Sequence, residues 1–294
     1  NKNIEDFRSY LTTLNSEITS LLLIAVDHHF YEKIASLIEK CQHLIKIKII
    51  IHDPTELAGK KSLPLLQLLR QNSEIEIITI RPRVQQHLSD QYSLNSTLKH
   101  HPFYRFPLVA NKKVAEKANQ YCKIVAMARI DHDKHTDIIV EANSQLPLDQ
   151  KITIYGAVNG FYAYKKLYHF DSMKTKDPDS MYQGTYKKDW NTIQEIVSSY
   201  DYIIDLSIIK NDGGHTQYSF LEAIYLSKVL ILHRRWVTGK DSIWVEGVNC
   251  LAVDSVSELC RLVKNPLSAE KYQEIITNSL EIIGPCFKNW SNLI

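Results

Sequence analysis

The sequence predicts an α/β protein built from two doubly wound domains in series. Three observations favour this fold class: a length of 294 residues, a hydrophobic share of 44%, and apolar runs that alternate with helical patterns. The length suits two domains that each bury a core. Only 9 residues are glycine, where ordinary usage would give roughly 20. Collagen-like chains and low-complexity segments are therefore excluded.

The first hundred residues alternate strand and helix patterns. Continuous apolar runs predict strands, and apolar residues at helical spacing predict helices. The expected order is strand, helix, strand, helix, strand and helix, over residues 21–26, 30–41, 45–51, 63–69, 75–80 and 84–91. This order predicts parallel strands joined by right-handed crossovers.

Residues 100–113 interrupt the alternation, because they include two prolines and show no helical spacing. We therefore expect a linker here. It separates a first domain over residues 1–108 from a second domain over residues 109–268.

The alternation then restarts in the second domain. Strands are expected over residues 123–128, 151–155, 202–206 and 229–232, with another leading to Gly184. Helices are expected over residues 136–146, 162–169, 190–199 and 269–283, and after Gly213-Gly214. Ligands of doubly wound sheets bind beyond the carboxyl ends of the strands, so the loops there are the expected binding site.

The charge balance limits the partners. With 35 basic and 33 acidic residues, the chain lacks the dense basic face that duplex nucleic acid needs, so no nucleic-acid partner is expected. Lysines at 46, 48, 60 and 61 could contact an anionic substrate or the inner membrane face peripherally, but such lysines more often form a solvated surface. The longest strongly apolar run, residues 21–26, is far short of the ~20 residues that span a bilayer.

Five cysteines, odd in number and without metal-ligand spacing, fit reduced thiols of a cytoplasmic protein. No signal peptide is visible, and the start at Asn1 suggests that preceding residues are missing.

Residues 211–223 form the most informative segment. A strand ending at Ser207 runs through Gly213-Gly214 into a helix with an apolar face. Unpaired amides and the helix dipole favour an anion at such a helix start, and two glycines allow its close approach. Glu222 lies about one turn further and is suited to ribose hydroxyls. The alternative is that Ser219 and Glu222 only form a capping box.

A second segment, residues 126–134, follows the first strand of the second domain. Arg129 and Lys134 lie five residues apart on one loop, where both can face the same crevice. A planar guanidinium and a mobile ammonium suit a pyrophosphate. The alternative is a solvated loop in which these cations pair with Asp131 and Asp133.

Together these segments resemble the donor-binding domain of group 1 glycosyltransferases, the retaining enzymes with an E-x7-E motif. The matching segments, in the family's order, are Ala128-Arg129, Lys134-His135 and residues 137–142, 152–156, 182–186, 201–207, 214–223, 248–251 and 287–290. Before the linker the match is looser, and residues 49–53 resemble the family's strand and cleft histidine.

The resemblance implies the α/β GT-B fold, in which two Rossmann-like domains face each other across a cleft. The first domain is expected to be short or truncated, and residues 269–294 to form a helix that crosses back to it. The implied function is transfer of a hexosyl-type sugar from a UDP- or GDP-sugar to an unknown glycan, lipid or protein acceptor. The nucleotide sugar is then a co-substrate, and neither a cofactor nor a metal is expected.

The resemblance also assigns roles to residues. It implies catalytic roles for His52, Arg129 and Lys134. The implied donor-binding set is Arg129, Lys134, Gly214, His215, Thr216, Tyr218, Ser219 and Glu222. His28 and His29 compete with His52 as the cleft residue, but a metal pair there lacks a third ligand at suitable spacing.

Three departures from the family pattern stand out. The first glutamate of E-x7-E falls on Gly214, the family's Lys-Gly becomes Lys134-His135, and the Gly-rich loop of the first domain has no counterpart before Leu21. Three other functions therefore stay open: a non-catalytic nucleotide-sugar-binding subunit, a sugar-nucleotide 2-epimerase and a phage-type DNA glucosyltransferase. The oligomeric state is not predicted.

Overall fold

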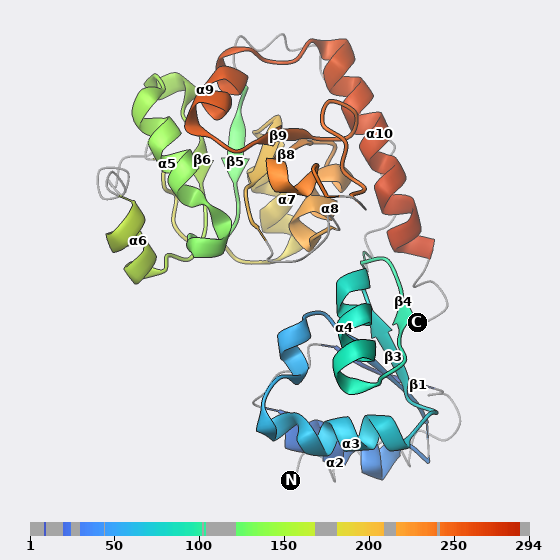
Figure 1. Cartoon of the computed structure of the whole chain (residues 1–294). Coiled ribbons are helices and arrows are strands. Elements are labelled where there is room, and N and C mark those ends of the chain that lie inside the picture. The colour runs from blue at the N-terminus through green and yellow to red at the C-terminus, as the bar shows by residue number, and fades with distance from the viewer. Residues whose placement is uncertain are drawn as a thin grey trace. The chain divides into compact units, whose positions relative to one another are not determined.

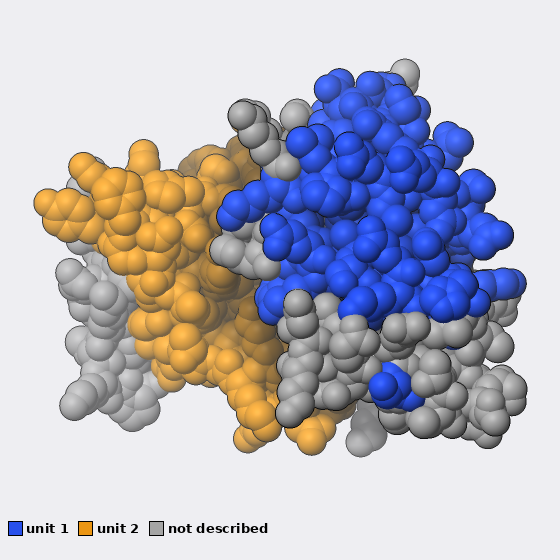
Figure 2. Space-filling model, turned by 90° about the horizontal axis from the view of Figure 1, so that it is seen from below, with its two compact units in different colours: residues 1–100 blue, residues 101–294 orange. Residues whose placement is uncertain are grey.

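The computed structural model describes Ser9 and residues 20–24, 30–43, 45–101, 103, 122–167, 181–208, 216–239 and 242–288. The chain divides into two compact units, residues 1–100 and residues 101–294 (Figures 1 and 2). The predicted boundary at residue 108 lies in a segment, residues 104–121, outside the described residues.

The first unit contains a four-stranded parallel sheet in the order β1-β2-β3-β4. Its strands are β1 (Ser20–Leu23), β2 (Lys46–Ile51), β3 (Glu76–Thr79) and β4 (Thr97–Leu98), and its helices are α2 (Tyr31–Cys41), α3 (Leu63–Gln71) and α4 (Pro82–Tyr92). Short 3-10 helices, η1 (Pro54–Leu57) and η2 (Lys60–Ser62), follow β2. The isoleucines of β2 are buried on both faces of the strand, which explains the continuous apolar run of its last three residues, Ile49 to Ile51.

The second unit contains a five-stranded parallel sheet in the order β6-β5-β7-β8-β9. Its strands are β5 (Ile124–Ala126), β6 (Thr153–Ile154), β7 (Tyr202–Asp205), β8 (Val229–His233) and β9 (Leu251–Val253). Its helices are α5 (Thr136–Gln145), α6 (Gly160–Lys166), α7 (Trp190–Ser198), α8 (Tyr218–Tyr225), α9 (Val256–Lys264) and α10 (Ala269–Lys288). Three 3-10 helices accompany them: η3 (His132–Lys134), η4 (Leu148–Gln150) and η6 (Arg234–Trp236).

Each face of the second sheet has its own core. Ile204 of β7 packs into the core that contains α5 and α9, and the neighbouring Ile203 packs into the core that contains α7 and α8. The alternation follows from the two-residue period of a strand. Helix α10 contributes to both cores and packs on α8 and β8 of its own unit (Figure 1). Its predicted crossing to the first domain stays a prediction.

The sequence patterns are confirmed in order, with several differences in detail. Sequence reasoning omitted β4, β9 and α9, and α10 continues through Pro285 to Lys288 rather than ending near residue 283. The strand expected before Gly184 is reduced to one isolated bridge between Ile154 and Tyr182. Among the described residues, no helix is both long and apolar enough to cross a membrane.

Candidate functional site

The loops after β5 and β7 meet at the carboxyl edge of the second sheet. In the sheet, β6 lies on one side of β5 and β7 lies on the other. The strand order therefore changes direction between β5 and β7. Such a switch point is where doubly wound sheets bind ligands. The amide of Ile208, after β7, donates to the carbonyl of Asp133, after β5, at 2.8 Å. The two loops are therefore joined directly.

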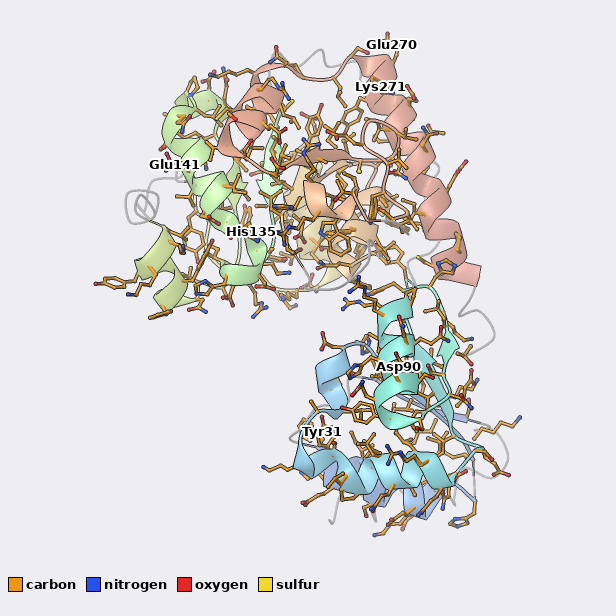
Figure 3. The ribbon with its side chains drawn as sticks, in the orientation of Figure 1. Tyr31, Asp90, His135, Glu141, Glu270 and Lys271 are labelled. Carbon is orange, nitrogen blue, oxygen red and sulfur yellow. The ribbon has the colours of Figure 1, made fainter. Side chains whose placement is uncertain are left out.

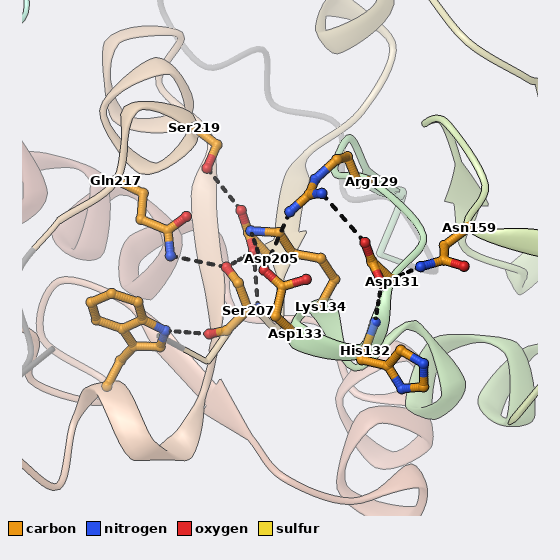
Figure 4. Close-up of polar contacts among 11 residues, drawn as sticks. Arg129, Asp131, His132, Asp133, Lys134, Asn159, Asp205, Ser207, Gln217 and Ser219 are labelled. Atoms are coloured by element: carbon orange, nitrogen blue, oxygen red, sulfur yellow. Dashed lines mark hydrogen bonds and ion pairs between the residues drawn. The ribbon is translucent and has the colours of Figure 1, made fainter. Parts of the chain in front are cut away.

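The loop after β5 brings Arg129 and Lys134 together around one carboxylate (Figure 4). The Oδ2 atom of Asp133 lies 3.6 Å from an Arg129 nitrogen and 3.8 Å from the Lys134 Nζ. Arg129 also contacts Asp131 at 3.3 Å. The two cations thus pair with carboxylates of their own loop, as the solvated-loop alternative predicted. Both cations also lie near a single anionic group, the carboxylate of Asp133.

Asp131 organises the short helix that carries these cations. Its side chain accepts a hydrogen bond from the amide of His132 at 2.8 Å and another from Asn159 at 2.9 Å (Figure 4). The His132 amide bond is the main cause that lowers the pKa of the Asp131 carboxyl, followed by the bond from Asn159 and the charge of Arg129. Asp131 therefore stays ionised at neutral pH and fixes the loop as the N-cap of η3.

The turn after β6 supports the backbone at Arg129. Gly156 has a φ of +150°, and a Cβ there would lie 1.9 Å from the carbonyl oxygen of Ala128. The neighbouring amide of Tyr155 donates to the carbonyl of Ala126 at 2.8 Å. Only a glycine allows this close approach of the two backbones.

His135 occupies the position of the family's glycine with a left-handed φ of 45°. Its ring centroid lies 5.2 Å from that of His233, the last residue of β8. Burial lowers the pKa of His233 to about 4, assisted by the neighbouring His135, Arg235 and Arg234. His233 is therefore neutral at pH 7, and its Nδ1 accepts the amide of Arg235 at 3.2 Å.

A second polar cluster joins β7 to the first turn of α8 (Figure 4). The buried carboxylate of Asp205 accepts the Ser219 hydroxyl at 2.8 Å and both the amide, at 3.0 Å, and the hydroxyl of Ser207. The side chain of Gln217 donates to the Ser207 hydroxyl at 3.0 Å, and the Trp236 indole donates to the Ser207 carbonyl at 2.6 Å. These side chains hold the end of β7 against the start of α8.

This geometry corrects the capping-box interpretation of Ser219 and Glu222. The N-cap of α8 is Gln217, and Ser219 lies inside the helix with its hydroxyl on Asp205. The hydroxyl of Ser219 therefore hydrogen-bonds to the last residue of β7 and not to the backbone of its own helix.

Tyr186 connects the two clusters. Its hydroxyl donates to the carbonyl of Met127, just after β5, at 3.0 Å. Burial raises the pKa of Tyr186 to about 12, and the charges of Glu222 and Asp205 add to this effect. Tyr186 therefore stays protonated, and its hydroxyl lies within the electrostatic influence of Glu222 and Asp205.

The remaining predicted donor residues are placed as follows. Thr216 is buried, and the exposed ring of Tyr218 lies 5.4 Å from the ring of Phe103. Gly214 and His215 lie outside the described residues. Sequence reasoning missed Asp205, Tyr186 and His233, although the charge of Asp205 at the end of an apolar strand is a visible signal.

In the first unit, His52 follows β2 and contacts Glu56. Its amide donates to Glu56 Oε2 at 2.9 Å, and its Nδ1 lies 3.5 Å from Glu56 Oε1. The Tyr31 hydroxyl donates to the Glu56 carbonyl. His52 thus lies at the carboxyl edge of its own sheet, held by a local pair. His28 and His29 lie outside the described residues.

Metal-ligating side chains do not gather in the part of the chain that the structure describes: it contains no group of three His, Cys, Asp or Glu residues that could hold an ion. All five cysteines are buried, and none of them forms a disulfide.

No known family model matches the chain, and no curated protein matches it in sequence. Solved structures do match it. The Anabaena protein Alr3699/HepE, crystallised with UDP and glucose, is 14% identical with a TM-score of 0.63 over 97% of this chain and 77% of its own. A glycosyltransferase from Rickettsia africae is 14% identical with a TM-score of 0.62 over 98% of this chain and 77% of its own.

A third match is the pneumococcal O-GlcNAc transferase GtfA, crystallised with UDP and GlcNAc. It is 13% identical with a TM-score of 0.56, over 98% of this chain and 58% of its own. The chain has the GT-B fold. Identities this low establish the fold alone, so the chemistry has to be argued from the site.

Proposed function

We propose that this chain is a glycosyltransferase that moves a sugar from a nucleotide-sugar donor to an acceptor. The observation that carries the proposal is the convergence of Arg129 and Lys134 on one anionic group at the β5–β7 switch point, beside the first turn of α8, in a chain with the GT-B fold. We assign it to the group 1, E-x7-E class, in which the sugar keeps its anomeric configuration.

The donor diphosphate binds where the Asp133 carboxylate now lies between the two cations. Arg129 supplies two parallel donors and Lys134 a point charge, a combination that suits phosphate oxygens. Negative charge grows on the diphosphate as its bond to the anomeric carbon breaks. These cations, with the amides at Tyr218 and Ser219, stabilise that charge where it develops.

The other donor contacts follow from the same placement. Glu222 holds the ribose hydroxyls, and Gly214, His215 and Thr216 line the sugar pocket. His52 contributes to catalysis from the first domain. No metal is needed, because the cations and the helix start neutralise the diphosphate. The protein acts in the cytoplasm, with a peripheral membrane contact as a further option.

UDP and UDP-sugars are the first ligands to test, because HepE and GtfA were crystallised with UDP. We expect UDP to bind the wild type and to raise its melting temperature, and Arg129→Ala or Glu222→Ala to abolish both effects. Titration calorimetry with UDP, GDP and their sugars measures the affinity directly.

Matched controls are Lys271→Ala and Glu274→Ala, which remove the same charges from an exposed ion pair on α10. Figure 3 shows Lys271 at the beginning of α10, well separated from His135 at the site. These variants should bind the nucleotide as the wild type does. If no nucleotide or nucleotide sugar binds the wild type, the proposed function is wrong.

A non-catalytic nucleotide-sugar-binding subunit is the second candidate, because Gly214 replaces the first glutamate of E-x7-E. The two functions differ in turnover. A transferase slowly hydrolyses its donor to free sugar and nucleoside diphosphate when water replaces the acceptor, whereas a binding subunit leaves the donor intact. Chromatography of a long incubation with UDP-glucose separates these results.

A further inference from the structure

Asp205 is a buried charged residue with no part in the chemistry proposed above. It ends β7, directly after the apolar residues Tyr202, Ile203 and Ile204, and only 4% of its surface is exposed. Burying a carboxylate is costly unless hydrogen bonds compensate it. Its three hydrogen bonds come from Ser207 and Ser219.

These hydrogen bonds join two points that are distant along the chain. Ser207 is two residues beyond Asp205, whereas Ser219 is on the first turn of α8 (Figure 4). Gln217 adds a bond to the hydroxyl of Ser207. Asp205 and Ser207 therefore tie the end of β7 to the beginning of α8.

The first turn of α8 has this tie instead of a side-chain cap, because the side chain of its N-cap residue, Gln217, makes no capping hydrogen bond. The intrahelical bonds begin with the amide of Phe220 on the carbonyl of Gln217 at 3.1 Å. The amides of Tyr218 and Ser219 precede that bond and have no backbone acceptor among the described residues, so they are the donors that the proposed function gives to the ligand.

The charge of Asp205 and its geometry act in opposite directions on a bound anion. A carboxylate beside an anion site repels the anion. Its hydrogen bond to Ser219, however, fixes the helix start whose amides face that anion. The carboxylate accepts from all three donors. An asparagine would accept from Ser207 through its oxygen and donate its NH2 group to the Ser219 hydroxyl, which replaces a charge-assisted bond with a weaker neutral one.

We propose that Asp205 is a positioning residue, which sets the first turn of α8 through Ser219 and thereby determines the affinity for the donor diphosphate without touching it. This inference rests on the proposed function for its ligand, and the hydrogen-bond tie can be tested without any ligand.

The experiment compares Asp205→Ala, Asp205→Asn and Ser219→Ala with the wild type. Hydrogen exchange of peptides covering residues 203–225, in the free protein, measures the tie. UDP titration measures its consequence. We expect faster exchange at the start of α8 in all three variants, and an affinity for UDP that falls about tenfold or more in Asp205→Ala and less in the other two.

Asn143→Ala is the matched control for a general loss of stability. Asn143 is buried on α5 and exchanges two hydrogen bonds of 2.8 Å with Ile152, away from the strand ends that form the site. Asn143→Ala should lower the melting temperature comparably and leave the UDP affinity unchanged.

The direction in which Asp205→Asn changes the UDP affinity shows whether Asp205 acts through its charge or by positioning α8. If the carboxylate acted through its charge, removing it would tighten UDP binding, and that result overturns the proposal. Unchanged hydrogen exchange at α8 in Asp205→Ala also overturns it. If the wild type binds no nucleotide, the proposed function and the donor role fail together, while hydrogen exchange still shows whether the tie exists.

Discussion

At the scale of single residues, the two cations of the candidate site pair with acidic groups of their own loop. Asp133 lies between Arg129 and Lys134, at distances of 3.6 and 3.8 Å. The side chain of Arg129 is 58% exposed, so water screens its pair with Asp133 and this pair is weak. In the proposed function, a diphosphate with a higher charge density takes the place of the carboxylate at Arg129.

Asp133→Asn should accordingly tighten UDP binding, by about three- to fivefold, because the variant removes a like charge next to the incoming diphosphate. Titration calorimetry at low salt measures this change. Asp149→Asn, which removes the same charge from an exposed residue of the same unit, is the control and should bind UDP as the wild type does. Weaker binding in Asp133→Asn would show that Asp133 supports the site instead of competing for it.

At the scale of elements, the site depends on how neighbouring strands and their turns approach one another. The turn at Gly156 lies against the backbone of Ala128 and Arg129 so closely that a methyl group does not fit. Phe103, just beyond the unit boundary, is fully buried against Tyr218 and Tyr225 of α8. The start of the expected linker therefore belongs to the core beneath the candidate site.

Gly156→Ala should destabilise the second unit and weaken UDP binding together, because the added Cβ forces the Arg129 loop away and strains a positive φ. A loss of about 1–3 kcal/mol in the free energy of unfolding is expected. Gly160→Ala is the control, since a Cβ there meets nothing within 4 Å. Urea unfolding and UDP titration test both variants, and equal behaviour of the two would contradict the role given to Gly156.

At the scale of the whole molecule, one buried histidine couples the stability of the second unit to pH. The folded pKa of His233 is about 4, below its ordinary value of 6.5. The unfolded chain therefore binds the proton more readily between these values. The stability that the second unit gains from keeping His233 neutral is complete above pH 6.5. It is lost as the pH falls from 6.5 toward 4.

We expect the free energy of unfolding of the second unit to fall by about 1.4 kcal/mol between pH 7.5 and 5.5 from this group. His233→Asn, which keeps an acceptor for the amide of Arg235, should lose this part of the pH dependence. Urea unfolding at both pH values gives the difference. An identical pH dependence in wild type and variant would show that His233 is not its source.

The sequence by itself determined the order of the elements and the loops that carry the candidate site. Local patterns sufficed for the strand that precedes Arg129, for the helix that contains Ser219, and for the five-residue spacing of Arg129 and Lys134. These patterns repeat every two residues in a strand and about every 3.6 residues in a helix, so a short stretch of chain contains them. The omission of α9 is not explained by its length, since α9 has nine residues, as do α3 and α7, which were predicted. Ser255 and Glu258 at its start are a visible helix signal that sequence reasoning overlooked.

Only the tertiary structure decided which of these loops meet. The hydrogen bond from Ser219 to Asp205, the hydrogen bond from Tyr186 to Met127, and the contact of His135 with His233 each join residues from different elements of the chain. Sequence spacing cannot supply such pairs, because the order of strands in the sheet and the packing of side chains against it determine which chain-distant groups come within hydrogen-bond distance.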